Sequence, residues 1–285
     1  MKFGIIGGSG LYEIEGLRNI NTVTVATPYG DPSDEFVSGE LEGKEVVFLP
    51  RHGKGHRYLP SEINYRANIW ALKSLGVTHL IAISAVGSLK EEIVPGHIVL
   101  VDQFIDRTKD RPSTFFGNGL IAHLQFGHPT CQHLSEQIAK AAETVGVTCH
   151  KGGTYVCMEG PMFSTRAESN MYRSFGASVI GMTNLQEAKL AREAELCFST
   201  IALATDYDCW HESEEEVTVD AILAVMRQNV ENTKAILKTL IGPFQPKNPE
   251  CRDQNSLQGA ILTPPEAIPE SVKKDLGIII GKYLG

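Results

Sequence analysis

The chain has 285 residues, of which 42% are apolar and 21% are charged, so it is long enough to bury a large core. Its formal net charge is −8 and it has no basic cluster, which argues against binding to the phosphate backbone of a nucleic acid. No apolar run approaches the roughly 18 residues of a membrane helix. The first residues comprise one lysine and a strand-like run, which does not match a signal peptide with a small-residue cleavage site. We therefore expect a cytoplasmic protein that binds neither nucleic acid nor membrane.

The cysteines stand at positions 131, 149, 157, 197, 209 and 251 and include no Cys-x-x-Cys pair. This spacing matches neither a small disulfide framework nor a structural zinc motif. We predict reduced, mostly buried thiols and no bound metal. The histidines of residues 123–133 resemble a ligand cluster at first sight, but no carboxylate or cysteine completes a metal-ligand spacing there.

Short apolar runs alternate with helical patterns, which is typical of an α/β fold with a mixed or parallel sheet. The predicted strands cover residues 2–7, 44–50, 78–84, 97–104, 178–183 and 198–208. Amphipathic helices are predicted over residues 62–76, 134–146, 185–195 and 218–242. We expect one α/β domain over residues 1–242. From Pro243 the chain is rich in Pro, Asn and Gln, and we expect residues 243–285 to pack on the same domain as a loop and a short helix.

Glycines or polar residues follow five of the predicted strands. The first strand leads into a glycine turn at 7–10, and the others lead into residues 51–53, 84–87, 182–184 and 206–208. In open α/β sheets, ligands bind at the carboxyl ends of the strands, where loops and helix N-termini present unpaired N–H groups. We therefore expect these five segments to meet at one edge of the sheet.

The first of these segments suit a small oxyanion such as orthophosphate. Glycine lets the backbone approach an anion closely, Ser9 adds a hydroxyl donor, and Arg51 with His52 adds a charged fork. Ser84 and Thr183 contribute two further hydroxyl groups. The glycine turn lacks the third glycine of GxGxxG, and the chain has no GxxxxGK[ST] motif, so neither a dinucleotide nor a triphosphate is the expected ligand.

Asp206 and Asp208 stand two residues apart in a predicted strand, so their side chains are expected on the same face. Two carboxylates can accept hydrogen bonds from an exocyclic amine. A like-charge pair in an apolar pocket also raises the pKa of one member, which can then share a proton with a ring nitrogen near neutrality. A purine with a 6-amino group beside N7 presents this pattern. Taken alone, the two aspartates are about as typical of a helix cap or an exposed loop as of a purine site.

Several longer stretches carry a family resemblance, in this order: GIIGGSGL, TPYGDPSD, RHGKGH, NYRANIWALK, GSLKEEIVPGHIVLVDQFIDRT, EGPMFSTRAES and ATDYDCW. They resemble the 5′-methylthioadenosine phosphorylases, in the trimeric branch of the purine nucleoside phosphorylase superfamily. The resemblance extends from residue 1 to about 240, and the segment after Pro243 has no counterpart in it. It implies one α/β domain around a twisted, partly barrel-like mixed sheet, a homotrimer, and no metal or organic cofactor, with inorganic phosphate as co-substrate.

The resemblance also implies roles for individual side chains. The phosphate site would comprise Ser9, Arg51, His52, Ser84, the backbone of Ala85, and Thr183. The purine and ribose site would comprise Phe163 stacked on the base, Met182 against the ribose, and Asp206 and Asp208 at N7 and the 6-amino group. The pocket for the 5′ group would comprise His56 and, from a neighbouring subunit, His123. Many relatives have threonine where this chain has Ser9 and Ser84, and serine keeps the hydroxyl group.

The implied reaction is phosphorolysis of 5′-methylthioadenosine to adenine and 5-methylthioribose 1-phosphate, in purine and methionine salvage. Two alternatives remain open. One is a phosphorylase for 6-oxopurine nucleosides such as inosine or 5′-methylthioinosine, although such relatives usually carry asparagine at the position of Asp206. The other is a nucleoside-binding module without catalysis.

Overall fold

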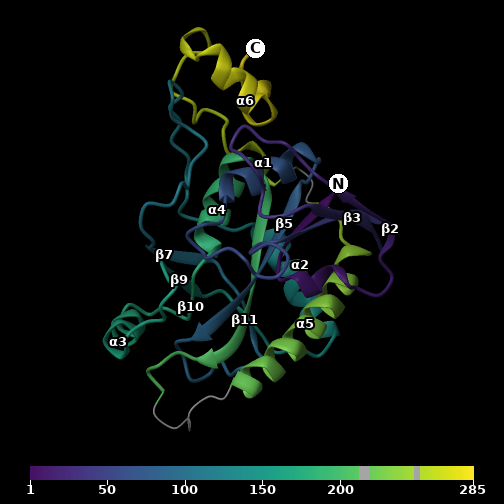
Figure 1. The fold of residues 1–285 in the computed structure, drawn as a ribbon, viewed down its shortest axis with the longest axis vertical. Helices are drawn as coiled ribbons and strands as arrows, with labels where there is room; N and C mark the ends of the chain where they lie inside the picture. Colours follow the sequence, from purple (N-terminus) through teal and green to yellow (C-terminus); the bar gives the residue numbers. More distant parts are fainter. Residues whose placement is uncertain (212–218, 247–250) are drawn as a thin grey trace.

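In the described part of the chain, a mixed sheet of 11 strands forms the centre of the protein and helices pack against it (Figure 1). The structure is a computed structural model that describes residues 1–211, 219–246 and 251–285, without the side chains of Ser9 and of residues 219–223. The strands are β1 (Phe3–Gly7), β2 (Arg18–Val23), β3 (Phe36–Leu41), β4 (Lys44–Pro50), β5 (His79–Ser88), β6 (Ile98–Leu100), β7 (Gln103–Arg107), β8 (Cys149–Lys151), β9 (Thr154–Met158), β10 (Val179–Gly181) and β11 (Cys197–Tyr207). The α-helices are α1 (Tyr65–Ser74), α2 (Gln132–Thr144), α3 (Arg166–Ser174), α4 (Asn184–Glu193), α5 (Val219–Ile241) and α6 (Glu270–Ile280). The predicted α/β fold with a mixed sheet is confirmed.

The sheet branches at β5. This strand pairs in parallel with β1 and with β11, and its last residues, Gly87 and Ser88, pair with β10 in the antiparallel sense. One path leads from β5 through β1, β4 and β3 to β2, a second through β10 and β9 to β7, and a third through β11 and β6 to β8. This branching gives the sheet its partly barrel-like form.

The central strands are buried on both faces, so their side chains supply separate hydrophobic clusters on the two sides. In β1, Phe3 and Ile5 join a cluster with the apolar faces of α2 and α5, whereas Ile6 joins a cluster with α1, α4 and α6. The alternation follows from the two-residue period of a strand. Among the described helices, none combines the length and the apolar composition that a membrane crossing requires.

The structure differs from the predicted elements in three places. The predicted strand 97–104 is divided into β6 and β7, because β6 pairs with β11 and β8 whereas β7 pairs with β9. The predicted strand 78–84 continues to Ser88, because its partner β11 and the returning β10 both extend that far. The strands β2, β3, β8 and β9 and the helix α3 were not predicted.

The segment after Pro243 packs on the same domain. Lys44 Nζ donates hydrogen bonds of 2.7 Å to the carbonyl oxygens of Ile241, Gly242 and Phe244, and so fixes the end of α5. Further along, α6 buries Leu276, Ile279 and Ile280 in the cluster that contains α1. Trp70 Nε1 of α1 also donates to the carbonyl of Asp275 at 2.8 Å. Figure 1 shows α6 beyond α1 at one end of the molecule.

Candidate active site

A pocket of about 570 Å³ lies where the five predicted segments meet. The predicted site residues that line it are Arg51, His52, His56, Ser84, Ala85, Phe163, Met182, Thr183, Asp206 and Asp208. Gly7 and Gly8 of the glycine turn line it as well. The expectation that these segments meet is therefore confirmed, with one difference: β5 runs through the site instead of ending at Ser84, so Ile83–Gly87 form a continuous wall.

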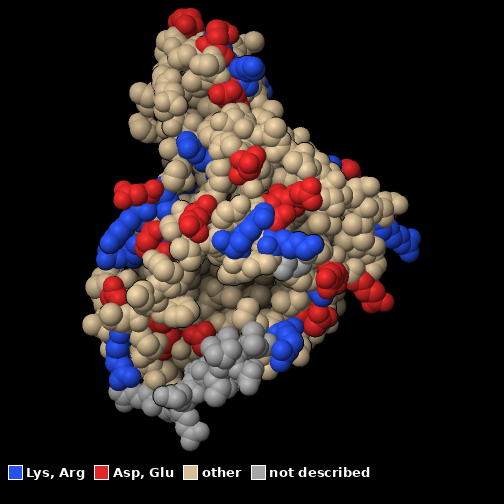
Figure 2. All heavy atoms as spheres, in the orientation of Figure 1, with Lys and Arg blue, Asp and Glu red and all other residues tan. Residues whose placement is uncertain are grey.

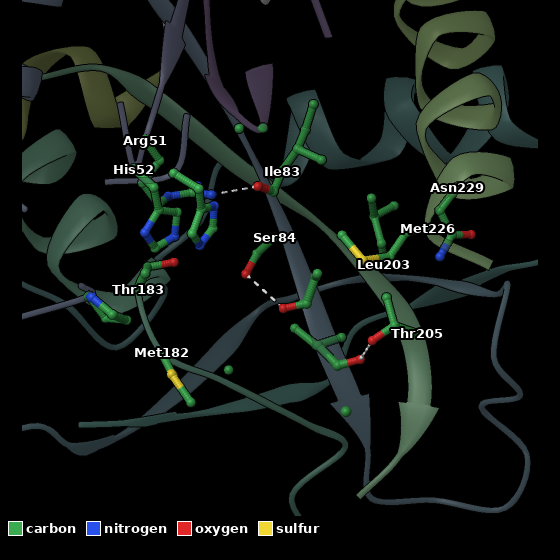
Figure 3. A pocket seen from close by; sticks show the side chains of 18 of the residues that line it. Arg51, His52, Ile83, Ser84, Met182, Thr183, Leu203, Thr205, Met226 and Asn229 are labelled. Carbon is green, nitrogen blue, oxygen red and sulfur yellow. Dashed lines mark hydrogen bonds between the residues drawn. The ribbon is translucent and has the colours of Figure 1, made fainter. Parts of the chain in front are cut away.

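The pocket has two chemically different sides (Figure 3). Arg51, His52, Ser84 and Thr183 gather on one side, whereas Leu203 of β11 and Met226 and Asn229 of α5 lie on the other. Figure 2 shows a hollow on the face viewed in Figure 1, with walls that are mostly neither acidic nor basic. The pocket therefore pairs a polar, donor-rich end with a more apolar end.

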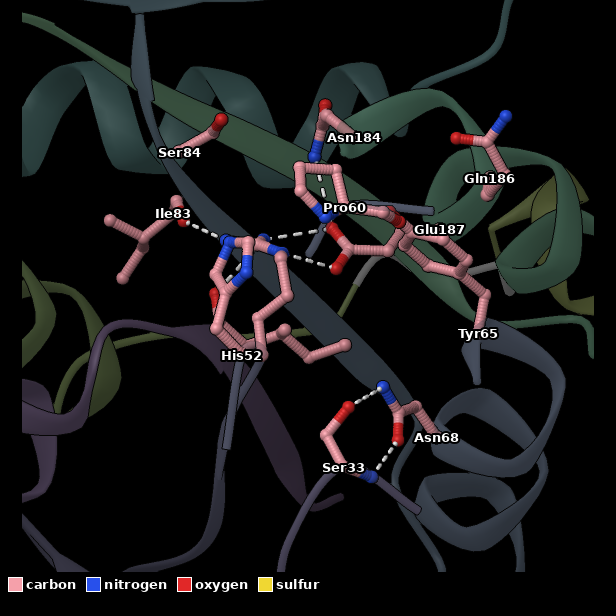
Figure 4. A network of polar contacts seen from close by, with 12 residues as sticks. Ser33, His52, Pro60, Tyr65, Asn68, Ile83, Ser84, Asn184, Gln186 and Glu187 are labelled. Carbon is pink, nitrogen blue, oxygen red and sulfur yellow. Dashed lines mark hydrogen bonds and ion pairs between the residues drawn. The ribbon is translucent and has the colours of Figure 1, made fainter. Parts of the chain in front are cut away.

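Arg51 is held by a carboxylate that the sequence analysis missed (Figure 4). Its Nε and Nη2 atoms lie 2.5 and 2.8 Å from the two oxygens of Glu187 in α4, and Nη1 donates to the carbonyl of Ile83 at 2.7 Å. Both side chains are buried, and Asn184 Nδ2 donates to the same carboxylate at 3.2 Å. Burial opposes the charge on Arg51, but Glu187 outweighs it and raises the pKa of the guanidinium. The cation of the predicted oxyanion site is thus already neutralised by an acid.

His52 is neutral in this environment. Burial lowers the pKa of its imidazole to about 4. Its Nδ1 lies 2.8 Å from the carbonyl oxygen of Tyr58, and since a carbonyl only accepts, Nδ1 carries the proton. Nε2 is then an acceptor at neutral pH. The ring stacks on the exposed His56, with ring centroids 4.2 Å apart.

Ser84 and Thr183 present hydroxyl groups to the pocket. Ser84 Oγ lies 3.1 Å from the hydroxyl of the buried Tyr155 of β9. Thr183 occupies the N-cap position of α4, yet its side chain makes no capping hydrogen bond. Gly181 makes room for this arrangement, because a Cβ there would lie 1.9 Å from the Tyr155 hydroxyl oxygen. Tyr155 is a further residue that the sequence analysis missed.

Asp206 and Asp208 lie together, as predicted. Thr205 Oγ1 donates to Asp206 Oδ2 at 2.6 Å and so orients that carboxylate. Asp208 is only 8% exposed, and its Oδ2 has no hydrogen-bond partner among the described residues. A Cβ on Gly87 would lie 3.3 Å from Asp206 Oδ1 and 3.4 Å from Asp208 Cβ, so glycine leaves the space in front of both side chains open. A buried carboxylate oxygen without a partner is costly, which indicates that a ligand completes it.

The remaining predicted residues are spread more widely. Phe163, in the loop that precedes α3, lines the pocket although 82% of it is exposed, and Met182 lines the same pocket. Asn229 was not predicted; its Nδ2 donates to the carbonyl of Ala204 at 3.1 Å, and its buried Oδ1 has no partner in the described ranges. The side chain of Ser9 lies outside the described residues. His123 is exposed in the long segment between β7 and α2, outside this chain's own pocket.

Potential metal ligands gather away from the pocket. In the described ranges, one group of three or more candidate ligands is found, formed by Cys131, Cys197, Cys251 and Asp253. The histidines of residues 123–133 form no such group there. All six cysteines carry free thiols in the structure.

Comparisons with known proteins agree with the motifs. The sequence profile of the Phosphorylase superfamily matches residues 2–242. An S-methyl-5′-thioadenosine phosphorylase of Geobacter sulfurreducens is 60% identical over 99% of this chain and 98% of its own. The enzyme of that name from Koribacter versatilis is 54% identical, over 100% of this chain and 97% of its own. The chain belongs to the Phosphorylase superfamily.

Solved structures of superfamily members share the fold. A methylthioadenosine phosphorylase from an Antarctic soil metagenomic library has a TM-score of 0.93 at 47% identity, over 97% of this chain and 98% of its own. The methylthioadenosine phosphorylase of Schistosoma mansoni in complex with adenine has a TM-score of 0.85 at 37% identity, over 92% of this chain and 99% of its own. The profile match ends at residue 242, but the bacterial relatives align over almost the whole chain. The segment after Pro243 is therefore shared with relatives, contrary to the expectation from the motifs.

Proposed function

We propose that the protein cleaves 5′-methylthioadenosine with inorganic phosphate, releasing adenine and 5-methylthioribose 1-phosphate. The observation that carries the proposal is the placement of donor groups suited to an oxyanion and of two aspartates in one pocket of about 570 Å³. Relatives that bear the name of this activity, up to 60% identical over nearly the full chain, support it. The reaction belongs to purine and methionine salvage.

Phosphate binds at the end of the pocket formed by Arg51, His52, Ser84 and Thr183, together with Ser9 and the backbone of Ala85. The bidentate pairing with Glu187 holds the guanidinium still, and its charge is compensated before phosphate arrives. Neutral His52 accepts a hydrogen bond from a P–OH group through Nε2. The N-terminus of α4, which begins directly after Thr183, adds a favourable dipole. The site therefore binds hydrogen phosphate through oriented dipoles more than through net charge.

The purine binds between Phe163 and the aspartates, with the ribose against Met182. A phosphate oxygen attacks the anomeric carbon and forms the new C–O bond while the bond from that carbon to N9 breaks, and the electron pair of the broken bond moves into the purine. Asp206, protonated in the complex, gives its proton to N7, and the proton that hydrogen phosphate loses on becoming the monoester replaces it. Asp208 accepts a hydrogen bond from the 6-amino group through the oxygen that lacks a partner. Adenine then leaves as a neutral base. Holding the two reactants in line supplies much of the rate increase.

The proposal also covers the oligomeric state of the protein and its need for a cofactor. We expect a cytoplasmic homotrimer in which His123 reaches the 5′ end of the substrate in a neighbouring pocket, near His56. His123 is exposed on its own subunit, and so are Phe163 of the pocket and Met162 beside it in the chain, which a neighbouring subunit would cover in this assembly. The reaction needs no metal or organic cofactor at this site, since the pocket residues supply the donors and acceptors that it requires.

Product analysis tests the proposal directly. The protein is incubated with 5′-methylthioadenosine, adenosine, inosine or 5′-methylthioinosine, each with and without phosphate, and the bases are separated by chromatography. Adenine released from methylthioadenosine only with phosphate is the expected result. Preferential release of hypoxanthine would assign the protein to 6-oxopurine nucleosides, and no phosphate-dependent release would leave a binding module.

A further inference from the structure

A second cluster of reactive side chains lies outside the pocket. Cys131 immediately precedes α2, Cys197 is the first residue of β11, and Cys251 and Asp253 lie at the start of the 3-10 helix η2 (Arg252–Asn255) in the C-terminal segment. Their three sulfur atoms and a carboxylate oxygen all lie within 4.8 Å of one another. Cys251 Sγ lies 3.3 Å from Cys131 Sγ and 3.3 Å from Asp253 Oδ2. Four metal-ligating groups from three distant segments therefore converge on one point.

We propose that Cys131, Cys197, Cys251 and Asp253 bind a structural zinc ion. A tetrahedral zinc ion lies about 2.3 Å from thiolate sulfur and about 2.0–2.2 Å from carboxylate oxygen, so its ligand atoms are roughly 3.5–3.8 Å apart. The cluster spans this range, from 3.3 Å for the shortest pairs to less than 4.8 Å for the longest. Three sulfurs and one oxygen form a closed set of four, which is typical of a structural site, and soft thiolate ligands favour zinc over magnesium or calcium.

The groups around the cluster orient its ligands as in known metal sites. Arg192 Nη1 lies 2.7 Å from Asp253 Oδ1, which leaves Oδ2 directed at Cys251. Arg192 is itself buried and is fixed by a hydrogen bond of 2.5 Å from Nη2 to the carbonyl of His128. Outer partners that orient a ligating carboxylate are a regular feature of metal sites.

The ligands must be deprotonated to bind the ion, because a thiolate and not a thiol ligates zinc. Zinc binding at this cluster should therefore release protons and weaken as the pH falls. The resulting site carries a net charge of −2, which the neighbouring Arg192 partly balances.

An ion can reach the cluster, and its binding has a structural consequence. Cys251 and Asp253 also line a second cavity of about 670 Å³, separate from the candidate active site, which provides an entry path. Cys197 begins the strand that ends at the aspartates of the pocket, and Cys251 belongs to the segment after Pro243. Zinc would thus fasten the C-terminal segment to the catalytic domain without entering the reaction.

Metal analysis of the purified full-length protein tests the site. The protein is produced in zinc-supplemented medium, passed over a desalting column, and analysed by plasma mass spectrometry. The parent is expected to retain stoichiometric zinc, and Cys251→Ser and Asp253→Ala to lose most of it. Cys149→Ser is the matched control, because Cys149 is a partly buried thiol of β8 outside the cluster, and it should keep the zinc of the parent. The variant Asp253→Cys should restore zinc to a four-thiolate site.

Cobalt substitution provides a second readout that does not depend on stability. The Co²⁺-loaded parent should show thiolate-to-cobalt charge-transfer absorption, stronger in Asp253→Cys and weakened in Cys251→Ser. Phosphorolysis by each variant serves as the check that it is folded. A parent that binds no zinc or cobalt above the level of Cys251→Ser, or one whose Cys131 and Cys251 are found by mass spectrometry as a disulfide in the native protein, would overturn the proposal.

Discussion

In the wall of the candidate active site, Nε of Arg51 lies 2.5 Å from one oxygen of Glu187 and Nη2 lies 2.8 Å from the other. The two side chains are 4% and 1% exposed. A buried pair of this kind stabilises weakly as a whole, but removing one partner leaves an uncompensated charge out of contact with water. The pair therefore holds the Arg51 guanidinium in position, and its loss should change both the stability of the protein and its response to phosphate.

Glu187→Gln keeps the shape of the side chain and removes its charge. We expect it to lower the free energy of unfolding by about 3–5 kcal/mol, because Arg51 is left buried and unpaired. Phosphate should stabilise this variant more than the parent, since the anion then pairs with the free guanidinium. Thermal unfolding with and without phosphate measures both effects. Glu231→Gln, whose exposed carboxylate pairs with the largely buried Lys234, is the control and should change stability by less than about 1 kcal/mol. Equal phosphate stabilisation of variant and parent would count against phosphate at Arg51.

His52 should make stability depend on pH. Its imidazole titrates at about 6.5 in the unfolded chain and at about 4 in the folded protein, because burial disfavours the charged form. The unfolded state therefore binds more protons between these values, so the contribution of His52 to stability is present above pH 6.5 and is lost as the pH falls towards 4. The buried His79, with its pKa also lowered to about 4, adds to the same slope.

The substitution His52→Asn tests this contribution. Asparagine can still donate to the carbonyl of Tyr58 but does not titrate, so the loss of stability between pH 6.5 and 4 should be smaller in the variant than in the parent. Urea unfolding across that range measures the slope. The exposed His128 provides the control His128→Asn, which should keep the slope of the parent. An unchanged slope in His52→Asn would mean that His52 is protonated or exposed in solution.

The sequence predicted the central strands and most helices because they carry strong periodic signals. β2 escaped prediction because its residues are almost all exposed, so it has no alternation of apolar and polar residues. α3 escaped because it buries little more than Ser169 and Tyr172, although Thr165 and Glu168 form a capping box at its start. That motif is visible in the sequence and could have located the helix. The division of residues 97–104 depended on strand pairing, which is not encoded locally.

Site residues that directly follow a strand could be predicted from the sequence, whereas residues brought to the site by helix packing could not. Arg51, Thr183 and Asp206 stand at strand ends, and the structure brings them into one pocket. Glu187 lies within the helix predicted over residues 185–195, and only the packing of α4 beside the residue that follows β4 shows that it pairs with Arg51. The cysteine cluster was missed for the same reason, because its ligands come from three segments that are more than 50 residues apart in the chain.

Gly181 should tolerate no side chain, because of Tyr155. A Cβ there would lie 1.9 Å from the tyrosine hydroxyl oxygen and 2.6 Å from its Cζ. We expect Gly181→Ala to destabilise the protein by about 1–3 kcal/mol through overpacking and to weaken phosphate binding, since Tyr155 supports Ser84. In a Tyr155→Phe background the alanine should cost less, because the nearest atom is gone. Denaturant unfolding of the four proteins of this double-mutant cycle measures the coupling, and strictly additive effects would contradict it.

Gly277→Ala in α6, where a Cβ meets nothing within 4 Å, should stabilise the protein by about 0.5–1 kcal/mol.

Substitutions of Asp206, of Asp208 and of Thr205, which orients Asp206, should have different kinetic effects. Asp206→Asn removes the carboxyl group that we propose protonates N7, so we expect kcat for methylthioadenosine to fall by about 10²–10⁴. Thr205→Val removes the 2.6 Å hydrogen bond to Asp206 and the longer 3.2 Å contact with the carbonyl of Val86. A hydrogen bond to a charged acceptor is worth about 1.5–3 kcal/mol, so a loss of roughly 10- to 150-fold is expected. Asp208→Asn should raise KM for methylthioadenosine more than it lowers kcat, because its unpartnered oxygen is assigned to the 6-amino group in ground state and transition state alike. Steady-state kinetics with methylthioadenosine and inosine separates the three. If Asp206 selects the base, the ratio of inosine turnover to methylthioadenosine turnover should rise in Asp206→Asn. The same ratio should stay near that of the parent in Thr205→Val. An unchanged ratio in Asp206→Asn would place the selection of the base elsewhere in the pocket.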